Sequence, residues 1–461
     1  MISQASAEGR EHALVTGAGM AGLLVALVLA DHYERVTLLD RDGFPDQPGF
    51  RNGVPQSPHT HVLLGRGLST LDTLIPGLQR EILDAGAVPI DWPGDALWLT
   101  AAGWSERFRP GTSIVSVSRD LLEWTVRQHV LRHPRVHVLP GVEVRGVLTD
   151  PGATTVIGAR IRQRGQTGTE EDLSAALVVD ATGRRSDCCR WLADLGYPTP
   201  DEMTIPVDIG YASRFYARVP EDRGWNLMLL QAQPPHHTRS GMMLPVDGDR
   251  WNVSLVGRLG ERPPTDDRGF LEFAAGLRSP VLYEFLKDSE PVSSARGFSI
   301  SRNYRRRFDT MSRWPDRFVV VGDAVCSLNP VFGQGMSVAA LGALELREEL
   351  ERTSSTDDLT RRLQASSVRA SADAWMVASS EDLRYLALST GERPPLRSRI
   401  VSPYFDRAIR AALRDRLVNS ALLDVMNLER SPMSLMHPRV LMRVIRPRLT
   451  TAEAEHPAEL S

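Results

Sequence analysis

The chain has 461 residues, too long for one simple core, and a prior of about 150 residues per domain predicts two or three domains. A net charge of −3 and a single lysine, Lys287, among scattered arginines give no reason to expect a nucleic-acid partner. The three cysteines, Cys188, Cys189 and Cys326, lack metal or redox spacing. They therefore indicate a reducing, cytoplasmic setting, and no metal site is expected.

The apolar segments are too short for a membrane protein. No uninterrupted apolar run approaches the roughly twenty residues that span a bilayer, so we expect no membrane span. The apolar segment near the N-terminus carries a glycine motif and does not have the pattern of a signal peptide.

Residues 12–42 have the pattern strand, tight turn, helix and strand, which is typical of a dinucleotide-binding unit. Gly17 permits the turn, Gly19 lets a pyrophosphate approach the backbone, and Gly22 lets the helix pack closely on the strand. Asp40 ends the second strand about twenty residues later, where its carboxylate can accept both ribose hydroxyls. A glycine-rich turn without a nucleotide is the alternative. The predicted phosphate-binding residues are Gly17, Ala18, Gly19, Met20, Ala21 and Gly22.

A loop rich in proline and glycine at residues 51–61 carries Arg51, Gln56, His59 and His61. Such loops beside a nucleotide fold often bind ligands, and a solvated connection with incidental histidines is the alternative. We do not expect the two histidines to bind a metal, because no carboxylate or cysteine partner lies nearby in the sequence.

A helix that begins after Ser118 opens with Arg119. A cation is unusual there, because the helix dipole favours anions at an N-terminus. Arg119 therefore indicates a bound anion, with a surface ion pair as the alternative. Further along, the apolar strand 175–180 ends in the small-residue turn 181–184, at the sheet edge where doubly wound folds bind ligands.

Between residues 205 and 259 the hydrophobic period changes to two, which predicts an antiparallel sheet inserted into the nucleotide domain. Its aromatic and methionine side chains suit one wall of an apolar cavity and suit an ordinary sheet core equally well. The candidate substrate residues are Trp92, Trp225, Met228, Met242 and Trp251.

The predicted fold class is α/β: a Rossmann-type nucleotide-binding domain, interrupted by an antiparallel-sheet substrate domain and followed by a C-terminal helical region. The nucleotide domain resumes at 317–324, and residues 371–446 have mostly helical patterns. The expected segments are 1–80, 118–204 and 301–352 for the nucleotide domain, 81–117 and 205–300 for the substrate domain, 353–449 for the helical region and 450–461 for a flexible tail.

Three segments together resemble FAD-dependent monooxygenases of the aromatic-hydroxylase superfamily, namely 17–22, 180–183 and 322–335. The resemblance implies FAD as the cofactor. It implies that Asp323 binds ribityl or ribose hydroxyls of the flavin, and that Arg119 lies on the phosphate and ribityl side. The backbone after Pro330 would touch the isoalloxazine. The implied contacts also include Arg41, Arg51, Val142, Gly333, Gln334, Gly335 and Met336.

A finer pattern resembles a subgroup from antibiotic pathways, on residues 53–61, 103–104, 118–119 and 323–325. That subgroup includes epoxidases of polyene polyketides and flavin-containing cyclases of the pyrroindomycin type, which perform a (4+2) cyclisation without net redox change. One departure concerns reduction, because the superfamily's usual Asp-Gly pair, associated with direct NADPH use, is replaced here by 181–183. We therefore expect either NADPH or a separate flavin reductase as the electron source.

The resemblance implies an epoxidase or hydroxylase in which reduced FAD and oxygen form a C4a-hydroperoxide that transfers oxygen to an apolar polyene or polyketide. The protein then needs only to hold the flavin, exclude water and place the substrate, so no catalytic side chain is assigned. Two alternatives stay open, a non-redox FAD-containing cyclase and an oxidoreductase of the geranylgeranyl-reductase kind. The expected partners are an apolar small molecule and, without direct NADPH use, a flavin reductase.

Overall fold

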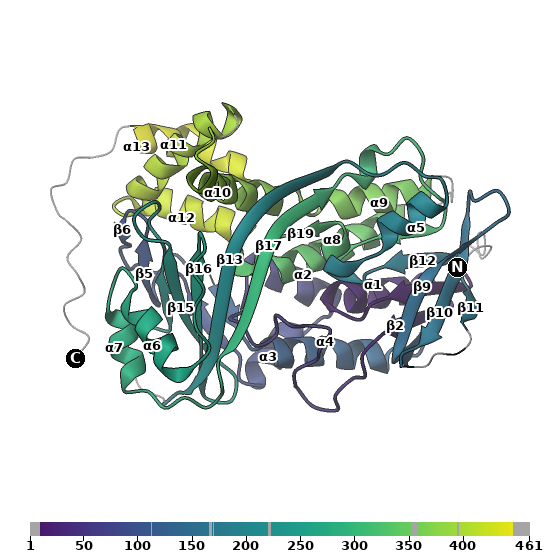
Figure 1. Cartoon of the computed structure of the whole chain (residues 1–461), viewed down its shortest axis with the longest axis horizontal. Helices are drawn as coiled ribbons and strands as arrows, with labels where there is room; N and C mark the ends of the chain where they lie inside the picture. The colour runs from purple at the N-terminus through teal and green to yellow at the C-terminus, as the bar shows by residue number, and fades with distance from the viewer. Residues whose placement is uncertain are drawn as a thin grey trace.

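The computed structural model describes residues 10–445 apart from 112, 166–167, 169, 220–222, 353–357 and 394–395, so the predicted tail at 450–461 lies outside the described residues. A parallel sheet with its helices occupies one end of the long axis, and a larger sheet occupies the other (Figure 1). The C-terminal helices lie beside the larger sheet (Figure 1). The predicted α/β class is confirmed.

The first sheet has five parallel strands in the order β18-β12-β1-β2-β8. Its central strands are apolar throughout, as expected where both faces of a parallel sheet are covered. Alternate residues face opposite sides, so that Ala13 and Val15 belong to one core and Leu14 belongs to another. The strands are β1 (His12–Thr16), β2 (Arg35–Asp40), β8 (Val136–Pro140), β12 (Leu177–Asp180) and β18 (Phe318–Val320).

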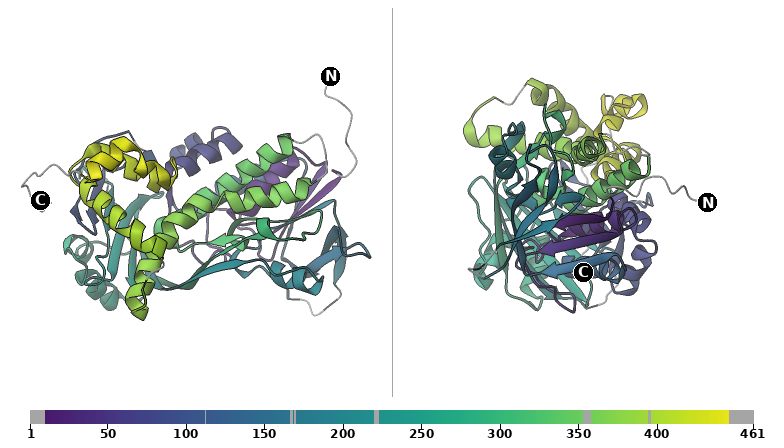
Figure 2. Two further views of the ribbon diagram at one scale, coloured as in Figure 1. Left: turned by 90° about the horizontal axis from the view of Figure 1, so that it is seen from above. Right: turned by 90° about the vertical axis from the view of Figure 1, so that its right-hand side faces the viewer.

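Helices cover one face of this sheet, and a small antiparallel sheet covers the other. The helices are α1 (Met20–Ala30), α2 (Gly65–Leu74), α3 (Leu78–Asp84), α4 (Arg119–Arg132), α8 (Gly335–Arg352) and α9 (Leu359–Arg369). Of these, α8 and α9 lie side by side (Figure 2). The other face carries β9 (Val142–Thr149), β10 (Val156–Gln163), β11 (Glu171–Ser174), η1 (Gly183–Arg185) and α5 (Cys188–Asp194).

The larger sheet has eight strands in the order β19-β17-β13-β16-β15-β14-β5-β6. The prediction of an antiparallel sheet needs one correction, because β14 and β5 pair in parallel. The reason is that β5 comes from the predicted segment 81–117, outside the stretch 205–259 in which the antiparallel pattern was found, and joins the sheet beside β14. The strands are β5 (Ala96–Thr100), β6 (Gly103–Trp104), β13 (Glu202–Ala217), β14 (Leu227–Leu230), β15 (Arg239–Val246), β16 (Arg250–Arg258), β17 (Arg296–Arg306) and β19 (Cys326–Ser327).

The two faces of the larger sheet are buried by different elements. One face packs under α6 (Asp267–Ala275) and α7 (Val281–Lys287). The other packs against the C-terminal region, which is helical as predicted. That region comprises α10 (Ala372–Thr390), α11 (Leu396–Ala412), α12 (Arg416–Met426), η5 (Pro432–Met436) and α13 (Pro438–Ile445).

Short elements join the two ends of the molecule. A three-stranded sheet is formed by β3 (Val62–Leu63), β4 (Val88–Asp91) and β7 (Ser113–Ser116), and the 3-10 turns are η2 (Phe308–Thr310), η3 (Gly322–Ala324) and η4 (Pro330–Phe332). Because η3 directly follows β18 and precedes β19, the larger sheet is attached to the carboxyl edge of the parallel sheet. No helix in the described part of the chain is long and apolar enough to cross a membrane.

Candidate functional site

A cavity of about 690 Å³ is lined by both sheets. Part of its lining comes from the turns after β1, β12 and β18, which are the carboxyl ends of three adjacent parallel strands. Doubly wound folds bind their ligands at this edge. Another part comes from β17, through Phe298, Ser299 and Ile300. The cavity therefore extends from the nucleotide-binding edge to the substrate sheet.

The glycine turn after β1 has no room for larger side chains. Gly17 has φ +95°, and a Cβ there would lie 2.5 Å from the carbonyl oxygen of Ala181. A Cβ on Gly22 would lie 1.7 Å from the carbonyl oxygen of Gly17, so α1 packs directly on the turn. In contrast, nothing lies within 4 Å of a Cβ on Gly19, which lines the cavity. The N-terminus of α1 is thus open to an anion, which its free N–H groups and dipole favour.

Asp40 closes β2 at the border of the cavity. Its Oδ2 accepts a hydrogen bond from the backbone N–H of Ala18 at 2.7 Å, and its Oδ1 accepts one from Asp42 at 2.8 Å. Each carboxylate oxygen has a second lone pair, so Asp40 can still accept hydroxyl groups of a ligand.

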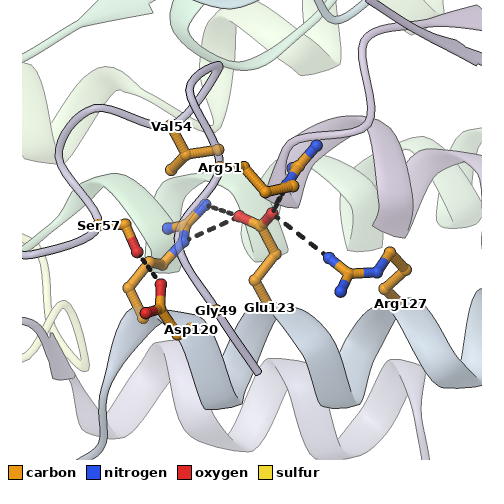
Figure 3. A pocket seen from close by; sticks show the side chains of 8 residues that line it. Gly49, Arg51, Val54, Ser57, Asp120, Glu123 and Arg127 are labelled. Atoms are coloured by element: carbon orange, nitrogen blue, oxygen red, sulfur yellow. Dashed lines mark hydrogen bonds and ion pairs between the residues drawn. The ribbon is translucent and has the colours of Figure 1, made fainter. Parts of the chain in front are cut away.

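Three arginines surround one buried carboxylate, Glu123 on α4, in a small pocket of its own (Figure 3). Arg51 Nε donates to Glu123 at 2.9 Å, Arg119 Nη2 lies at 3.0 Å, and Arg127 Nη1 lies at 3.9 Å. Burial alone would raise the pKa of Glu123, but Arg119 and Arg51 outweigh it and lower that pKa. Arg119 is therefore in a buried ion pair rather than a surface one, and it also lines the large cavity.

The same cluster encloses a second cavity of about 10 Å³, the size of one water molecule. Arg51 extends from it to the nucleotide turn, because its Nη2 donates to the carbonyl of Ala18 at 2.9 Å and its Nη1 lies 3.6 Å from Asp40. The cluster thus couples α4 to the turn at the N-terminus of α1.

Asp323 lies in η3, at the carboxyl end of β18, and lines the large cavity. Its carboxylate has no hydrogen bond to another side chain among the residues that the structure describes. Asp323 is exposed toward the open cavity, and partial desolvation by the surrounding protein raises its pKa, although the charges of Arg184 and Arg119 oppose the rise. This carboxylate is free to accept hydroxyl groups of a ligand.

The segment after Asp323 reaches α8 through a short capped turn. Asn329 Oδ1 accepts a hydrogen bond from the N–H of Val331 at 3.0 Å and so caps η4. Gly333 ends that turn with φ +64°, a conformation that favours glycine. Asn329, Pro330 and Gly333 all line the cavity, as do Gly335 and Met336 at the start of α8.

The loop at 51–61 is held against the larger sheet and the cavity. Burial lowers the pKa of His59 to about 4, and burial together with Arg119 lowers that of His61 to about 3. His59 Nδ1 lies 2.7 Å from Ser213 Oγ, and His61 Nε2 lies 2.9 Å from the carbonyl oxygen of Gln56. Both imidazoles are therefore neutral at pH 7. In the described part of the chain, no three His, Cys, Asp or Glu side chains gather as a metal site.

The five candidate substrate residues are divided between the two faces of the larger sheet. Trp225, Met228 and Trp251 are buried in the core under α6 and α7, where they have the contacts of a sheet core. Trp92 and Met242 lie on the opposite side, with the C-terminal helices. None of the five lines the large cavity.

The strand register shows which residues lie on the same face of the larger sheet as Met242. Directly paired residues share a face, and one such row crosses five strands: Trp98, Leu229, Met242, Ser254 and Ser213. Ser213 at one end contacts His59, whereas Trp98 and Leu229 at the other end pack with the C-terminal helices. The row is therefore polar beside the 51–61 loop and apolar beyond it.

The cavity brings together all but three of the predicted cofactor residues. Those that line it are Gly17, Gly19, Met20, Ala21, Asp40, Arg41, Arg51, Arg119, Val142, Asp323, Pro330, Gly333, Gly335 and Met336. Ala18, Gly22 and Gln334 are buried outside its lining.

Sequence reasoning missed Glu123, Asn329 and the β17 residues of the lining. Two of these had a local signal, since Arg119, Glu123 and Arg127 follow one another at a spacing of four, and Asn329 precedes a proline. The β17 residues had none, because only the pairing of the larger sheet brings them to the cavity.

Comparison with known proteins identifies the family. A family model described as an FAD binding domain matches residues 10–379. Protein Rv3254 of Mycobacterium tuberculosis (strain ATCC 25618 / H37Rv) is 31% identical over 420 residues, covering 88% of this chain and 87% of the relative.

Two solved structures share the fold. A triple mutant of the flavin-dependent brominase Bmp2 has a TM-score of 0.64 at 16% identity, covering 94% of this chain and 98% of its own. The p-nitrophenol 4-monooxygenase PnpA from Pseudomonas putida DLL-E4 has a TM-score of 0.62 at 19% identity, covering 90% of this chain and 98% of its own. The glycine turn, Asp40 and the free carboxylate of Asp323 fit a dinucleotide cofactor. The chain therefore belongs to the FAD binding domain family and is an FAD-dependent enzyme with the fold of flavin monooxygenases.

Proposed function

We propose that this enzyme is a monooxygenase that epoxidises or hydroxylates an apolar polyene or polyketide intermediate of natural-product biosynthesis. The observation that carries the proposal is that one cavity is lined both by the glycine turn and by Phe298 and Ile300 of the substrate sheet. A flavin that fills it would have its ring end beside that sheet. An oxygen acceptor on the sheet would then be next to the cofactor.

The proposal assigns residues of the cavity to the parts of FAD. The N-terminus of α1 would hold the pyrophosphate, Asp40 the ribose, and Asp323 the ribityl hydroxyls. The backbone of 333–336 would border the isoalloxazine. When bound and reduced, FAD supplies the oxygen chemistry, and the chain supplies binding and orientation.

The side chains near the ring end favour an apolar acceptor. The rings of His59, Tyr211 and Phe298 form one group, with centroids 5.5 Å apart for His59 and Phe298 and 5.9 Å apart for His59 and Tyr211. With His59 neutral, this group excludes water without presenting a charge. Beyond the polar Ser213 and Ser254, the same face carries the partly buried Leu229 and Met242, which suit an extended hydrocarbon.

The turn after β12 is the segment that bears on whether NADPH reduces the flavin directly. Thr182 occupies this turn, where its N–H and its hydroxyl both donate to Asp180 Oδ1, at 2.9 Å and 2.6 Å. The turn is thus closed on itself, and we propose that a flavin reductase, rather than direct docking of NADPH, supplies the electrons. Reduction of the bound FAD by NADPH alone at the same rate as with a flavin reductase added would contradict this part of the proposal.

The test uses the FAD-loaded protein, reduced without oxygen and then mixed with oxygenated buffer. The proposal predicts a delayed return of the oxidised flavin spectrum, and incorporation of ¹⁸O from ¹⁸O₂ into a linear polyene, with geranylgeraniol as the first probe. Immediate return of that spectrum with stoichiometric hydrogen peroxide, with and without the polyene, would refute oxygen transfer. A flavin that resists reduction would instead favour the non-redox cyclase, and flavin oxidation by the polyene without ¹⁸O would favour the reductase alternative.

A further inference from the structure

A second buried carboxylate lies far along the chain from the nucleotide motifs, on α10. The side chain of Asp382 is 0% exposed. Arg258 Nη1 donates to its Oδ1 at 3.0 Å, and Asn329 Nδ2 donates to its Oδ2 at 2.6 Å. The side-chain amide of Asn303 donates to Oδ2 as well. Asp382 therefore joins the C-terminal helices to β16, to β17 and to the segment before η4.

Asn329 uses both ends of its amide. Its Oδ1 caps η4 through the N–H of Val331, while its Nδ2 donates to Asp382. Since Asn329 itself lines the cavity, a change at Asp382 reaches the cavity through a single side chain. Of the residues that follow, Pro330, Gly333, Gly335 and Met336 also line the cavity.

The site requires an acceptor with two oxygens. Arg258 and the two amide groups all point donors at Asp382, and a carboxylate can accept from all of them. An asparagine in its place would present one NH₂ group toward another donor. The guanidinium of Arg258 also stacks on the Tyr385 ring, 4.1 Å from the centroid, which holds it beside α10.

We propose that Asp382 is a positioning residue for the flavin ring: through Asn329 it sets the backbone of 330–336, so that the C-terminal helices determine the environment of the isoalloxazine. The inference rests on the proposed location of the ring at 333–336. It does not depend on whether the flavin transfers oxygen.

The test compares Asp382→Asn with the wild type as full-length, FAD-loaded proteins. We expect a changed visible spectrum of the bound flavin, a shifted midpoint potential, and an FAD affinity weakened about tenfold, because a charged hydrogen bond to the cavity segment is lost. The matched control is Asp406→Asn, which removes the ion pair of Arg384 on the same helix, 2.7 Å long, without touching Asn329. The control should alter the melting temperature and leave the flavin spectrum unchanged.

Asn329→Ser provides a second variant if Asp382→Asn does not fold. A serine hydroxyl can still cap η4, but it is too short to keep the bond to Asp382. It should reproduce the spectral and potential shifts, and the double variant should show no more than one variant alone. A wild-type spectrum and potential in Asn329→Ser, or fully additive shifts in the double variant, would overturn the proposal. Because every readout concerns bound flavin, failure of oxygen transfer would leave this test intact.

Discussion

Two buried carboxylates, Glu123 and Asp382, lie beside the same cavity and differ in how they are held. Glu123 has two of its three arginines on its own helix, one turn before and one turn after it. Asp382 takes its three donors from residues 124, 79 and 53 positions away. The first is a local cluster beside the nucleotide turn, and the second is a tertiary junction beside the proposed ring.

Because the two carboxylates reach the cavity through different side chains, they should affect different properties of the bound cofactor. The Glu123 cluster reaches the cavity through Arg51 and Arg119, two cations that can attract the phosphates of a cofactor. Asp382 is connected to the cavity through the neutral Asn329, which holds the backbone at the start of η4. We therefore expect changes around Glu123 to affect retention of FAD, and changes at Asp382 to alter the properties of FAD that stays bound.

The largest expected effect, complete loss of bound FAD, comes from changes in the turns that line the cavity. Gly17→Val places a branched side chain at φ +95° and 2.5 Å from the Ala181 carbonyl oxygen, so the turn cannot keep its shape. Asp323→Ala removes the free carboxylate from the other cavity turn. Both variants should be purified without flavin, as measured by the ratio of visible to ultraviolet absorbance. Yellow protein from both would refute the proposed FAD contacts.

Glu123→Gln should have the next largest effect, and it tests the local arginine cluster directly. It leaves three arginines around a neutral group, and removing one partner of a buried ion pair costs about 3–5 kcal/mol. Urea unfolding should show this loss at pH 7. The variant should also be less sensitive to acid. The pKa of Glu123 is lower in the folded protein than in the unfolded chain, so its ionised form stabilises the fold at pH values above the unfolded-state pKa. The wild type loses this stabilisation as the pH falls, whereas Glu123→Gln has none to lose.

Equal stability of Glu123→Gln and wild type at pH 7 would contradict this account of the cluster. Arg80→Gln serves as the control, since its ion pair with Asp84 is 88% exposed on the arginine side and contributes little.

His59 tests the loop that begins at the Glu123 cluster and ends at the larger sheet. Its pKa is about 4 in the folded protein, against the ordinary histidine value of 6.5. Between these values the unfolded chain binds the proton and the folded one does not, so stability falls as pH decreases. From pH 7 to pH 5, His59 should account for about 2 kcal/mol of lost unfolding free energy.

His59→Gln retains a polar side chain opposite Ser213 and has no titratable group. Its unfolding free energy should decline less than that of the wild type over the same range, measured by urea titration at both pH values. Identical declines would place the acid sensitivity elsewhere, with His61 as the next candidate because its pKa is about 3.

The smallest expected effect lies outside both carboxylate clusters. Glu272→Gln breaks an exposed ion pair with Arg268 on α6, on the far face of the larger sheet. Such helix pairs are worth about 0.3–0.5 kcal/mol, and raising the salt concentration should remove the difference. A loss above 1 kcal/mol, or any change in the flavin spectrum, would show that the far face is coupled to the cavity.

Much of the nucleotide end was predictable because its signals are local. Gly17, Gly22 and Asp40 follow from the demands of a tight turn, close helix packing and a strand end, and these act over about thirty residues. Glu123 was readable too, from the spacing of its arginines, although it was not predicted. The period of two likewise predicted an inserted sheet, but not the parallel pair of β14 with β5.

The sequence by itself determined the fold class, the nucleotide turn and most of the cavity lining at that end, because periodicity and glycine spacing are properties of consecutive residues. Only the tertiary structure decided which face each sheet residue occupies, placing Met242 toward the C-terminal helices and Trp251 under α6 and α7. It alone joined Asp382 to Arg258 and Asn329, since strand register and helix docking bring together groups that no local pattern relates.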